Sequence, residues 1–357
     1  MARLTRARQQ AHNRARVLAA AGEEFAERGF RDAKIDRIAE RADLTRGAVY
    51  SNFPGKRALY FAVLADAAER ADAPAVDPGT DPASALAAFA RLRLSRVPLT
   101  EADDSLGTGA ALTPEVLSDA PVRRAFAQLT RLDAILLGLA LEDLAGDGRR
   151  RVRQAQAVLT VLHGAEATAA TTPGVIDPFT VIRTCEHLAG LELDDTDPPP
   201  HLAHVGAAVR VDEPWSPPAG VDLLTREPVD PTVDGVVVVL GLERLEAVED
   251  ALRAAPGAVT AVIVTDAPAE RGPLVRAVLA DLRRCLSRAF PGRPRARLVL
   301  DDDGAIAAAA GADSVDDGTE FALRITDGRV SARSTERGAG YAVADTARPR
   351  TPGRARR

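Results

Sequence analysis

The residues with the clearest chemical potential lie close together near the start of the chain. Arg46, Ser51 and Asn52 carry hydrogen-bond donors, and Tyr50 adds a hydroxyl group. Such groups contact the phosphate oxygens and base edges of DNA. Thr45 is placed to cap a helix, and the end of a capped helix leaves backbone amides available to a phosphate. The stretch therefore indicates nucleic-acid binding rather than catalysis.

Two short helices must position these side chains. Apolar residues recur at helical spacing over 35–42 and again over 44–50, and Asp43 lies between them. Asp tolerates the left-handed backbone of a tight turn better than most residues. The pattern predicts a helix-turn-helix, whose second helix can enter the major groove. The alternative is an ordinary helical hairpin with Tyr50 and Phe53 as core aromatics, and we do expect Phe53 to pack in the core.

Charge is distributed unevenly along the 357 residues. Residues 1–57 carry thirteen Lys or Arg and seven Asp or Glu, a net charge of +6, whereas the remainder carries 33 and 44, a net charge of −11. A basic segment on an acidic body suits phosphate binding, because its cations displace counterions from DNA. Residues 346–357 form a second basic stretch, which we expect to be disordered.

Several classes of protein are disfavoured. No apolar run approaches the roughly 20 residues that span a bilayer, and the amino terminus has no apolar stretch typical of a signal peptide. Two cysteines cannot build a disulfide framework, and neither they nor the five histidines show metal-ligand spacing. We therefore predict a cytoplasmic protein with no membrane partner, no metal and no cofactor.

The remainder of the chain divides into a helical part and an α/β part. Helical periodicity continues to residue 193, and the Pro- and Asp-rich residues 194–220 are predicted as a linker without regular structure. Short apolar strands then alternate with helices, and Asp327-Gly328 is a hairpin signal. The expected strands are 236–240, 258–264, 296–300, 321–326 and 329–335, and the expected helices lie around 242–252 and 274–286.

Residues 29–64, GFRDAKIDRIAERADLTRGAVYSNFPGKRALYFAVL, resemble the TetR family of bacterial transcriptional regulators. The resemblance is dense from about residue 14 to 64, and the all-α layout extends it to 193. It implies DNA contacts from Thr45, Arg46, Gly47, Tyr50, Ser51, Asn52 and Lys56. Two departures stand out. Ala33-Lys34 replaces the usual Thr/Ser pair, so that Lys34 becomes a further candidate for a phosphate contact, and Asp43 stands where Gly is commoner.

The TetR resemblance also implies a mechanism. Family members dimerise through their last two helices, here 149–170 and 177–191, and a twofold dimer binds a palindromic operator. A small-molecule effector held within helices 81–170 would change the separation of the two recognition helices and release a repressed gene. Its identity stays open. The polar candidates for the effector site are Arg91, Gln128, Arg131, Asp133 and His163, although each is also typical of a surface or bundle position.

Residues 212–345 resemble the thioredoxin-like fold, especially peroxiredoxin-type members, through the strand order and the segment DDDGAIAAAAGA. That chemistry needs a low-pKa thiolate just after the first core strand, where this chain reads GLERLEAVED. Cys285 lies on an apolar helix face and is interpreted as buried and inert, and Cys185 lies in the expected dimer helix. We therefore predict that the protein is not an enzyme. A redox enzyme or a protein-interaction module in this region stays the alternative.

The predicted fold class is multidomain: an all-α helix-turn-helix with a helical ligand-binding and dimerisation bundle, followed by an α/β thioredoxin-like domain. The expected boundaries are a helix-turn-helix domain at 8–60, an effector-binding and dimerisation domain at 61–193, a linker at 194–211, the thioredoxin-like domain at 212–345 and a basic tail at 346–357.

Overall fold

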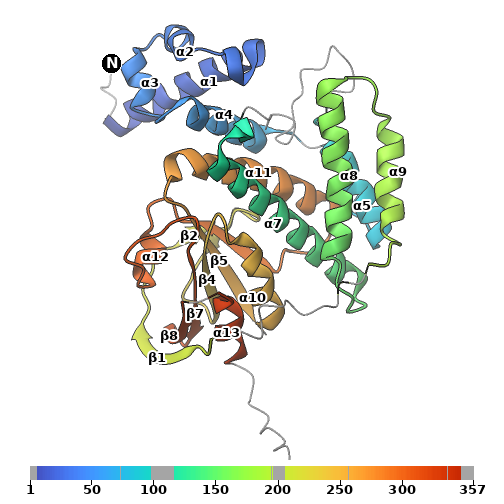
Figure 1. The fold of residues 1–357 in the computed structure, drawn as a ribbon, viewed down its shortest axis with the longest axis vertical. Coiled ribbons are helices and arrows are strands. Elements are labelled where there is room, and N and C mark those ends of the chain that lie inside the picture. The colour runs from blue at the N-terminus through green and yellow to red at the C-terminus, as the bar shows by residue number, and fades with distance from the viewer. Residues whose placement is uncertain are drawn as a thin grey trace, which may run out of the picture. The chain divides into compact units, whose positions relative to one another are not determined.

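The structure, a computed structural model, describes residues 6–72, 74–97, 116–193, 195, 206–255, 257–335 and 337–346 (Figure 1). The chain divides into two compact units, and each takes segments from distant parts of the sequence. The first unit contains Met1–Phe126, Ala157–Leu191 and Ala267–Pro291, and the second contains Ala127–Gln156, Glu192–Asp266 and Gly292–Arg357. The predicted basic tail lies, except for Thr346, outside the described residues.

The first unit begins with four helices: α1 (Arg6–Asp32), α2 (Ile35–Arg41), α3 (Arg46–Tyr50) and α4 (Lys56–Arg70). Gly29 has a left-handed backbone (φ 68°) and interrupts the first helix, which continues for one short turn to Asp32. Val17, Ala21 and Phe25 form the buried apolar side of this helix. Gly55, directly after Pro54, is the N-cap of α4.

The helical segments expected between residues 81 and 193 are all present. They are α5 (Pro82–Leu94), α7 (Ala120–Ala145), α8 (Val152–Thr171) and α9 (Pro178–Leu188), with a short 3-10 turn at η1 (Val116–Ser118). Asp81 and Ser84 form a capping box at the start of α5, which fixes where that helix begins. Both α7 and α8 run from one compact unit into the other.

Helix α11 (Pro268–Ala289) is the main surprise in the first unit. It connects two strands of the sheet along the chain, yet it packs against α4 and α5 (Figure 1). Glu270 bonds to Arg57 at the start of α4 (2.6 Å), and Arg283 bonds to Glu69 at the end of α4 (2.7 Å). Helices α4 and α11 therefore run parallel. The region 212–345, which was predicted to form a separate thioredoxin-like domain, thus contributes one helix to the helical unit.

The second unit is built on a six-stranded mixed sheet with the order β1-β8-β7-β4-β5-β6. Strands β4, β5 and β6 are parallel to one another, whereas β7, β8 and β1 add on antiparallel. Their bounds are β1 (Val209–Pro214), β4 (Gly235–Gly241), β5 (Ala258–Val264), β6 (Ala296–Leu300), β7 (Glu320–Thr326) and β8 (Arg329–Ser334). A separate two-stranded ribbon pairs β2 (Gly220–Val221) with β3 (Pro228–Val229).

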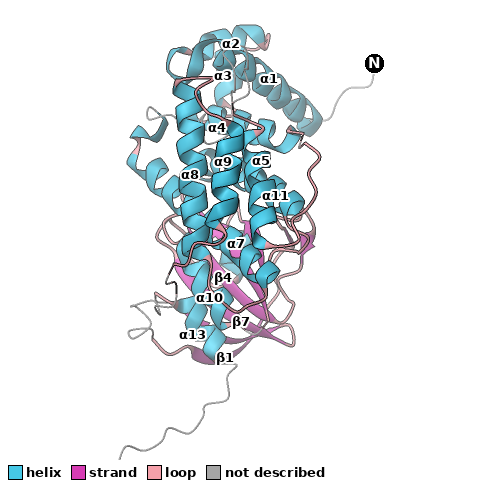
Figure 2. Cartoon of the chain, turned by 90° about the vertical axis from the view of Figure 1, so that its right-hand side faces the viewer, coloured by secondary structure: helices cyan, strands magenta, loops and turns pink. Residues whose placement is uncertain are grey.

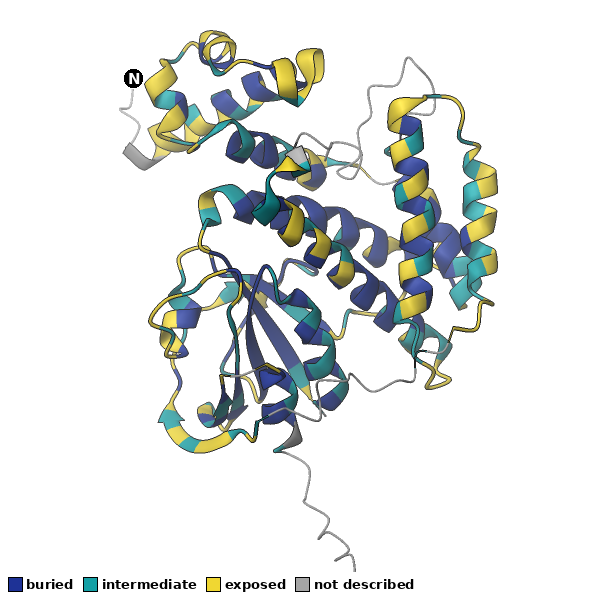
Figure 3. Cartoon of the chain, in the orientation of Figure 1, coloured by how far each residue is buried: buried dark blue, intermediate teal, exposed yellow. Residues whose placement is uncertain are grey.

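Both faces of this sheet are covered, which explains the continuous apolar run of β4 (Figure 3). On one face Val237 and Val239 pack with Trp215 and with Ile306 of α12 (Ala305–Ala309). Helix α10 (Val248–Ala254), which follows η3 (Leu245–Ala247), contacts β4 (Figure 2). Helix α13 (Ala339–Asp345) contacts β4 and β7. Asp327 and Gly328 both have positive φ (52° and 68°), as the predicted hairpin turn requires.

One expectation about the linker was wrong. Residues 209–214 form the edge strand β1, although 194–220 were predicted to lack regular structure. The strand pairs with β8, and Arg329 and Arg333 of β8 bond to Asp212 and Glu213 across the pair. Partners distant in sequence therefore provide the stabilisation that the local composition did not indicate. None of the helices in the described part of the chain is long and apolar enough to span a membrane.

Candidate DNA-binding surface

The turn between α2 and α3 has the geometry that the sequence predicted. Asp43 has a left-handed backbone (φ 48°), and its amide and that of Leu44 donate to carbonyl oxygens of α2. Ile38 and Val49 are buried, so each helix presents its apolar side inward. Thr45 caps α3, because its hydroxyl oxygen accepts a hydrogen bond from the amide of Ala48 (3.2 Å).

Arg46 and Tyr50 form the exposed part of α3. The Arg46 side chain is 61% exposed and Tyr50 is 42% exposed. The Arg46 guanidinium lies 5.6 Å from the centre of the Tyr50 ring and pairs with Asp36 of α2 (3.2 Å). A guanidinium and a phenol hydroxyl thus lie together on a surface that is open to a partner. Gly47 lies between them without a side chain, and a Cβ there would meet only the Thr45 hydroxyl, at 3.9 Å.

The polar groups that follow α3 mostly bond within the chain. Ser51 Oγ and Asn52 Nδ2 both donate to the carbonyl oxygen of Ala48 (2.9 and 2.8 Å). Lys56 Nζ donates to the Arg31 carbonyl oxygen (2.9 Å) and lies 5.0 Å from the Phe30 ring, and burial lowers the pKa of this lysine. These three side chains bond to backbone carbonyl oxygens, whereas Arg46 bonds to the exposed carboxylate of Asp36, so DNA would compete with an existing bond at each of the four.

Lys34 takes the N-cap position of α2 but provides no side-chain cap. The amide of Lys34 donates instead to the buried carboxylate of Glu24 (3.2 Å). This contact satisfies the amide of the N-cap residue itself, and it does not supply the bond that a Thr or Ser cap would accept from the first turn of α2. Lys34 is an exposed residue at the start of α2, so its side chain keeps the freedom that a phosphate contact requires.

Two arginines of α1 that sequence reasoning missed hold the helix-turn-helix in place. Arg14 donates to the Asn52 carbonyl oxygen (3.1 Å) and lies 4.2 Å from the centre of the Phe53 ring. Arg16 donates to the backbone oxygen of Asp43 (3.2 Å) and pairs with its carboxylate (3.1 Å). Phe53 itself is buried, as predicted. Nothing in the local spacing of these arginines distinguishes them from solvated charges.

The five polar candidates for an effector site divide between the two units, with Arg91 and His163 in the first and the other three in the second. Gln128 accepts a hydrogen bond from the Glu246 amide (3.0 Å), and Arg131 pairs with the Glu246 carboxylate, so both hold η3 in the second unit. Asp133 is buried, and Arg91 is exposed. Burial, together with nearby Arg93, lowers the pKa of His163 to about 4, so this ring is neutral at pH 7. None of the five lines either of the two cavities described below.

The interior of the helical unit contains an ionic cluster that joins α5, α8 and α11. Arg93 pairs with Glu166 (2.7 Å) and Asp281 (3.4 Å), and all three side chains are at least 93% buried. Asp281 also pairs with Arg96 (3.2 Å) and Arg284 (2.8 Å). Burial alone would raise the pKa of Asp281, but the three guanidinium groups outweigh it and hold that pKa below the ordinary value. Burial raises the pKa of Glu166.

Both cysteines are buried free thiols, and neither is disposed for redox chemistry. Burial raises the pKa of Cys185 to about 11. Burial, reinforced by Asp281, raises the pKa of Cys285 to about 12. Since the thiolate is the reactive form, both side chains are protonated and unreactive at pH 7.

A thiol count tests this directly. We expect neither cysteine to react with an aromatic disulfide reagent at pH 7.5 while the protein is folded, and both to react once urea unfolds it. The Cys285→Ser variant should behave like the parent protein in a peroxide-reduction assay. One equivalent of thiol that reacts within minutes in the folded protein would contradict the assignment.

Comparisons with known proteins support the amino-terminal interpretation. Residues 17–63 match the family model of bacterial regulatory proteins of the tetR family. The chain is 48% identical over 65 residues to the HTH-type transcriptional regulator SrpR of Pseudomonas putida, which covers 18% of this chain and 30% of that protein. It is 43% identical over 51 residues to the HTH-type transcriptional activator FasR of Mycolicibacterium smegmatis, which covers 14% and 23%. The chain thus spans less than half of these relatives.

A solved TetR transcriptional regulator from Rhodococcus sp. RHA1 aligns with 52% of this chain and 99% of its own, at 21% identity and a TM-score of 0.33. The match to the family model, over residues 17–63, includes α2, the turn and α3. This segment is similar to the DNA-binding helix-turn-helix of TetR-type transcriptional regulators.

Proposed function

We propose that the protein is a TetR-type transcriptional regulator that binds a palindromic operator as a homodimer and represses its target genes until an effector binds. The observation that carries the proposal is the exposed surface of α3, which presents the side chains of Arg46 and Tyr50. This helix is capped by Thr45 and follows a left-handed turn at Asp43. The matching family model over residues 17–63 supports it.

The test is a titration of the full-length protein against DNA from its own upstream region at several salt concentrations. If the protein makes six or more phosphate contacts, raising the salt concentration from 50 to 200 mM should lower the affinity for DNA by about a thousandfold or more. An interaction that is absent, or indifferent to salt, would overturn the proposal. Transcription from the same DNA in vitro then separates repression from activation, a distinction that matters because FasR is named an activator.

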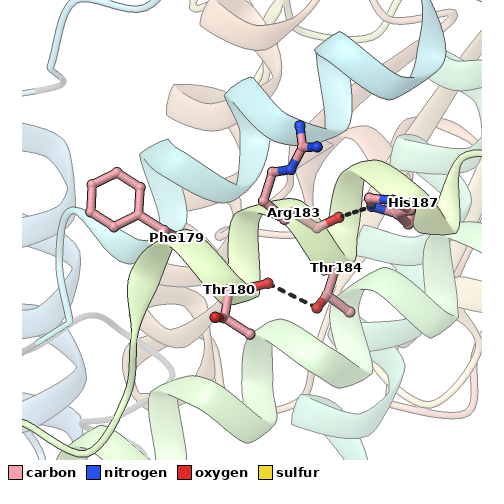
Figure 4. Close-up of a pocket in the computed structure, with 5 residues that line it drawn as sticks. All are labelled: Phe179, Thr180, Arg183, Thr184 and His187. Carbon is pink, nitrogen blue, oxygen red and sulfur yellow. Dashed lines mark hydrogen bonds between the residues drawn. The ribbon is translucent and has the colours of Figure 1, made fainter.

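Helix α9 supports the homodimer. Cys185 is its one buried residue within the described part of the chain. Phe179 is 77% exposed, and it borders an open hollow of about 460 Å³ with Thr180, Arg183, Thr184 and His187 (Figure 4). Although α9 packs against α5, the Phe179 ring stays exposed, so it is available to pack against a partner. The TetR resemblance makes that partner a second copy of the chain.

Replacing Phe179 by glutamate is therefore expected to convert the dimer into a monomer and to abolish operator binding, because one half-site alone binds weakly. Light scattering after size-exclusion chromatography gives the mass. Glu192→Lys is the matched control, since it changes charge at an exposed ion pair with Arg149 outside α9. A Phe179→Glu variant that stays dimeric at micromolar concentration would refute the role of α9.

The second unit supports a thioredoxin-like scaffold without the enzyme's nucleophile. Its central strands follow the order β5-β4-β7-β8, with a parallel pair and an antiparallel hairpin, and α13 follows β8. The residues after β4 are Leu242, Glu243 and Arg244, where a peroxidatic cysteine would have to lie. This scaffold is proposed as a sensing or interaction module, and the redox-enzyme alternative is disfavoured.

A further inference from the structure

A cavity of about 220 Å³ lies in the seam where the last turns of α4 and α11 meet. Both helices contribute to it, so an occupant would touch the helix that follows the DNA-binding segment and the helix that the sheet region inserts into the helical unit. Its polar lining consists of Glu69, Asp72, Arg283, Arg284, Ser287 and Arg288.

One side chain that lines the cavity has a buried hydrogen-bond donor without an acceptor. The Arg284 side chain is only 7% exposed. Its two terminal nitrogens donate to the Leu92 carbonyl oxygen (3.1 Å) and to Asp281 (2.8 Å). Its Nε is buried and has no hydrogen-bond partner. A buried charged donor without an acceptor is costly, and an acceptor brought by a ligand would remove that cost.

The charges around the cavity leave Arg288 as the cation that an anionic occupant would meet. Three guanidinium groups and two carboxylates line the cavity, but Arg283 is paired with Glu69 (2.7 Å) and Arg284 is paired with Asp281 (2.8 Å). The carbonyl ends of α4 and α11 also lie here, and their partial negative charge opposes an anion. Arg288 and Ser287 are exposed on the last turn of α11, and Ser287 Oγ, which donates to the Arg284 carbonyl oxygen (3.4 Å), would have to turn toward a ligand.

We propose that this cavity binds a small oxyanion, a carboxylate or phosphate group, through Arg288, Ser287 and the Nε hydrogen of Arg284. Guanidinium groups suit such ligands because their planar donors match two oxygens of one anion. Asp72 opposes the ligand and weakens its binding. Binding itself does not depend on the proposed function. The expected consequence, a change in operator affinity through α4, rests on it.

The test is calorimetric titration of the full-length protein with inorganic phosphate and, separately, with succinate, at constant ionic strength. At least one should bind with a Kd of about 1 mM or below. Arg288→Gln should weaken that binding by about tenfold, the usual value of one charged hydrogen bond, and Asp72→Asn should tighten it. Arg293→Gln, an exposed ion-pair residue of the second unit, is the control and should bind as the parent does.

Failure to bind either anion at about 10 mM, or equal binding by the parent and Arg288→Gln, overturns the proposal. A preference for phosphate or for succinate identifies which oxyanion the site takes. Operator affinity is then measured with and without the bound anion, with chloride replacing its ionic strength. If the parent protein binds no operator at all, the proposed function fails, while the titration still decides whether the cavity is a site.

Discussion

Replacing Arg46 by alanine is expected to weaken operator binding by at least about 30-fold. The Arg46 side chain is 61% exposed and sits on the recognition helix beside Tyr50. An arginine contact to a base or a phosphate contributes about 1–3 kcal/mol, and a twofold dimer loses it twice, so the loss is at least about 2 kcal/mol. If Arg46 contacts a phosphate, its removal should also reduce the slope of log affinity against log salt concentration by about one in each subunit.

The protein should stay folded, because exposed substitutions usually change the free energy of unfolding by less than about 0.5 kcal/mol. Tyr50→Phe, which removes only the hydroxyl, should weaken binding by a smaller factor. Arg293→Ala, which breaks an exposed pair with Glu227 in the second unit, is the control and should bind DNA normally. Arg46→Ala binding within twofold of the parent would mean that α3 does not face the operator.

Replacing Asp281 by alanine is expected to give the largest loss of stability, about 3–5 kcal/mol in the free energy of unfolding. Asp281 is the carboxylate that Arg93, Arg96 and Arg284 share. Removing it takes away the carboxylate that these three guanidinium groups share in or near the interior, while Arg93 keeps its pair with Glu166. Desolvated charges without a counter-charge are far more costly than a missing pair at the surface.

Urea unfolding followed by circular dichroism measures the effect. Asp212→Ala is the matched control, because its carboxylate is 81% exposed and pairs with Arg329 at the surface. That change should cost less than about 1 kcal/mol. Asp281→Asn keeps the shape of the side chain and should fall between the two. If Asp281→Ala unfolds within about 1 kcal/mol of the parent, the cluster does not hold α11 in the helical unit.

Local sequence was sufficient for much of the fold. Thr45 at a cap, Asp43 at a left-handed turn and Asp327-Gly328 in a hairpin are each explained by a few neighbouring residues, and all three are confirmed. The uninterrupted apolar run of 236–240 also predicted a buried strand correctly. In each case the determining interactions span only a few positions of the chain.

Long-range features were less accessible. The apolar stripe of α11 predicted a helix, but periodicity shows which face is buried and not against what, so its packing on α4 was not foreseen. For β1, pairing partners more than a hundred residues away override a linker-like composition. At the candidate site, the residue types predicted exposed donors. Lys56 nevertheless bonds to the carbonyl oxygen of Arg31, because folding brings α1 beside the start of α4, which the local sequence does not show.

The central claim is that two copies of α3 bind one operator together, and footprinting on the protein's own upstream DNA tests it most directly. We predict two protected half-sites related by twofold symmetry, with centres about 10 base pairs or a multiple of this apart, and protection that Arg46→Ala removes. A single protected half-site, or no protection at protein concentrations that retain the DNA in a gel, would contradict the account.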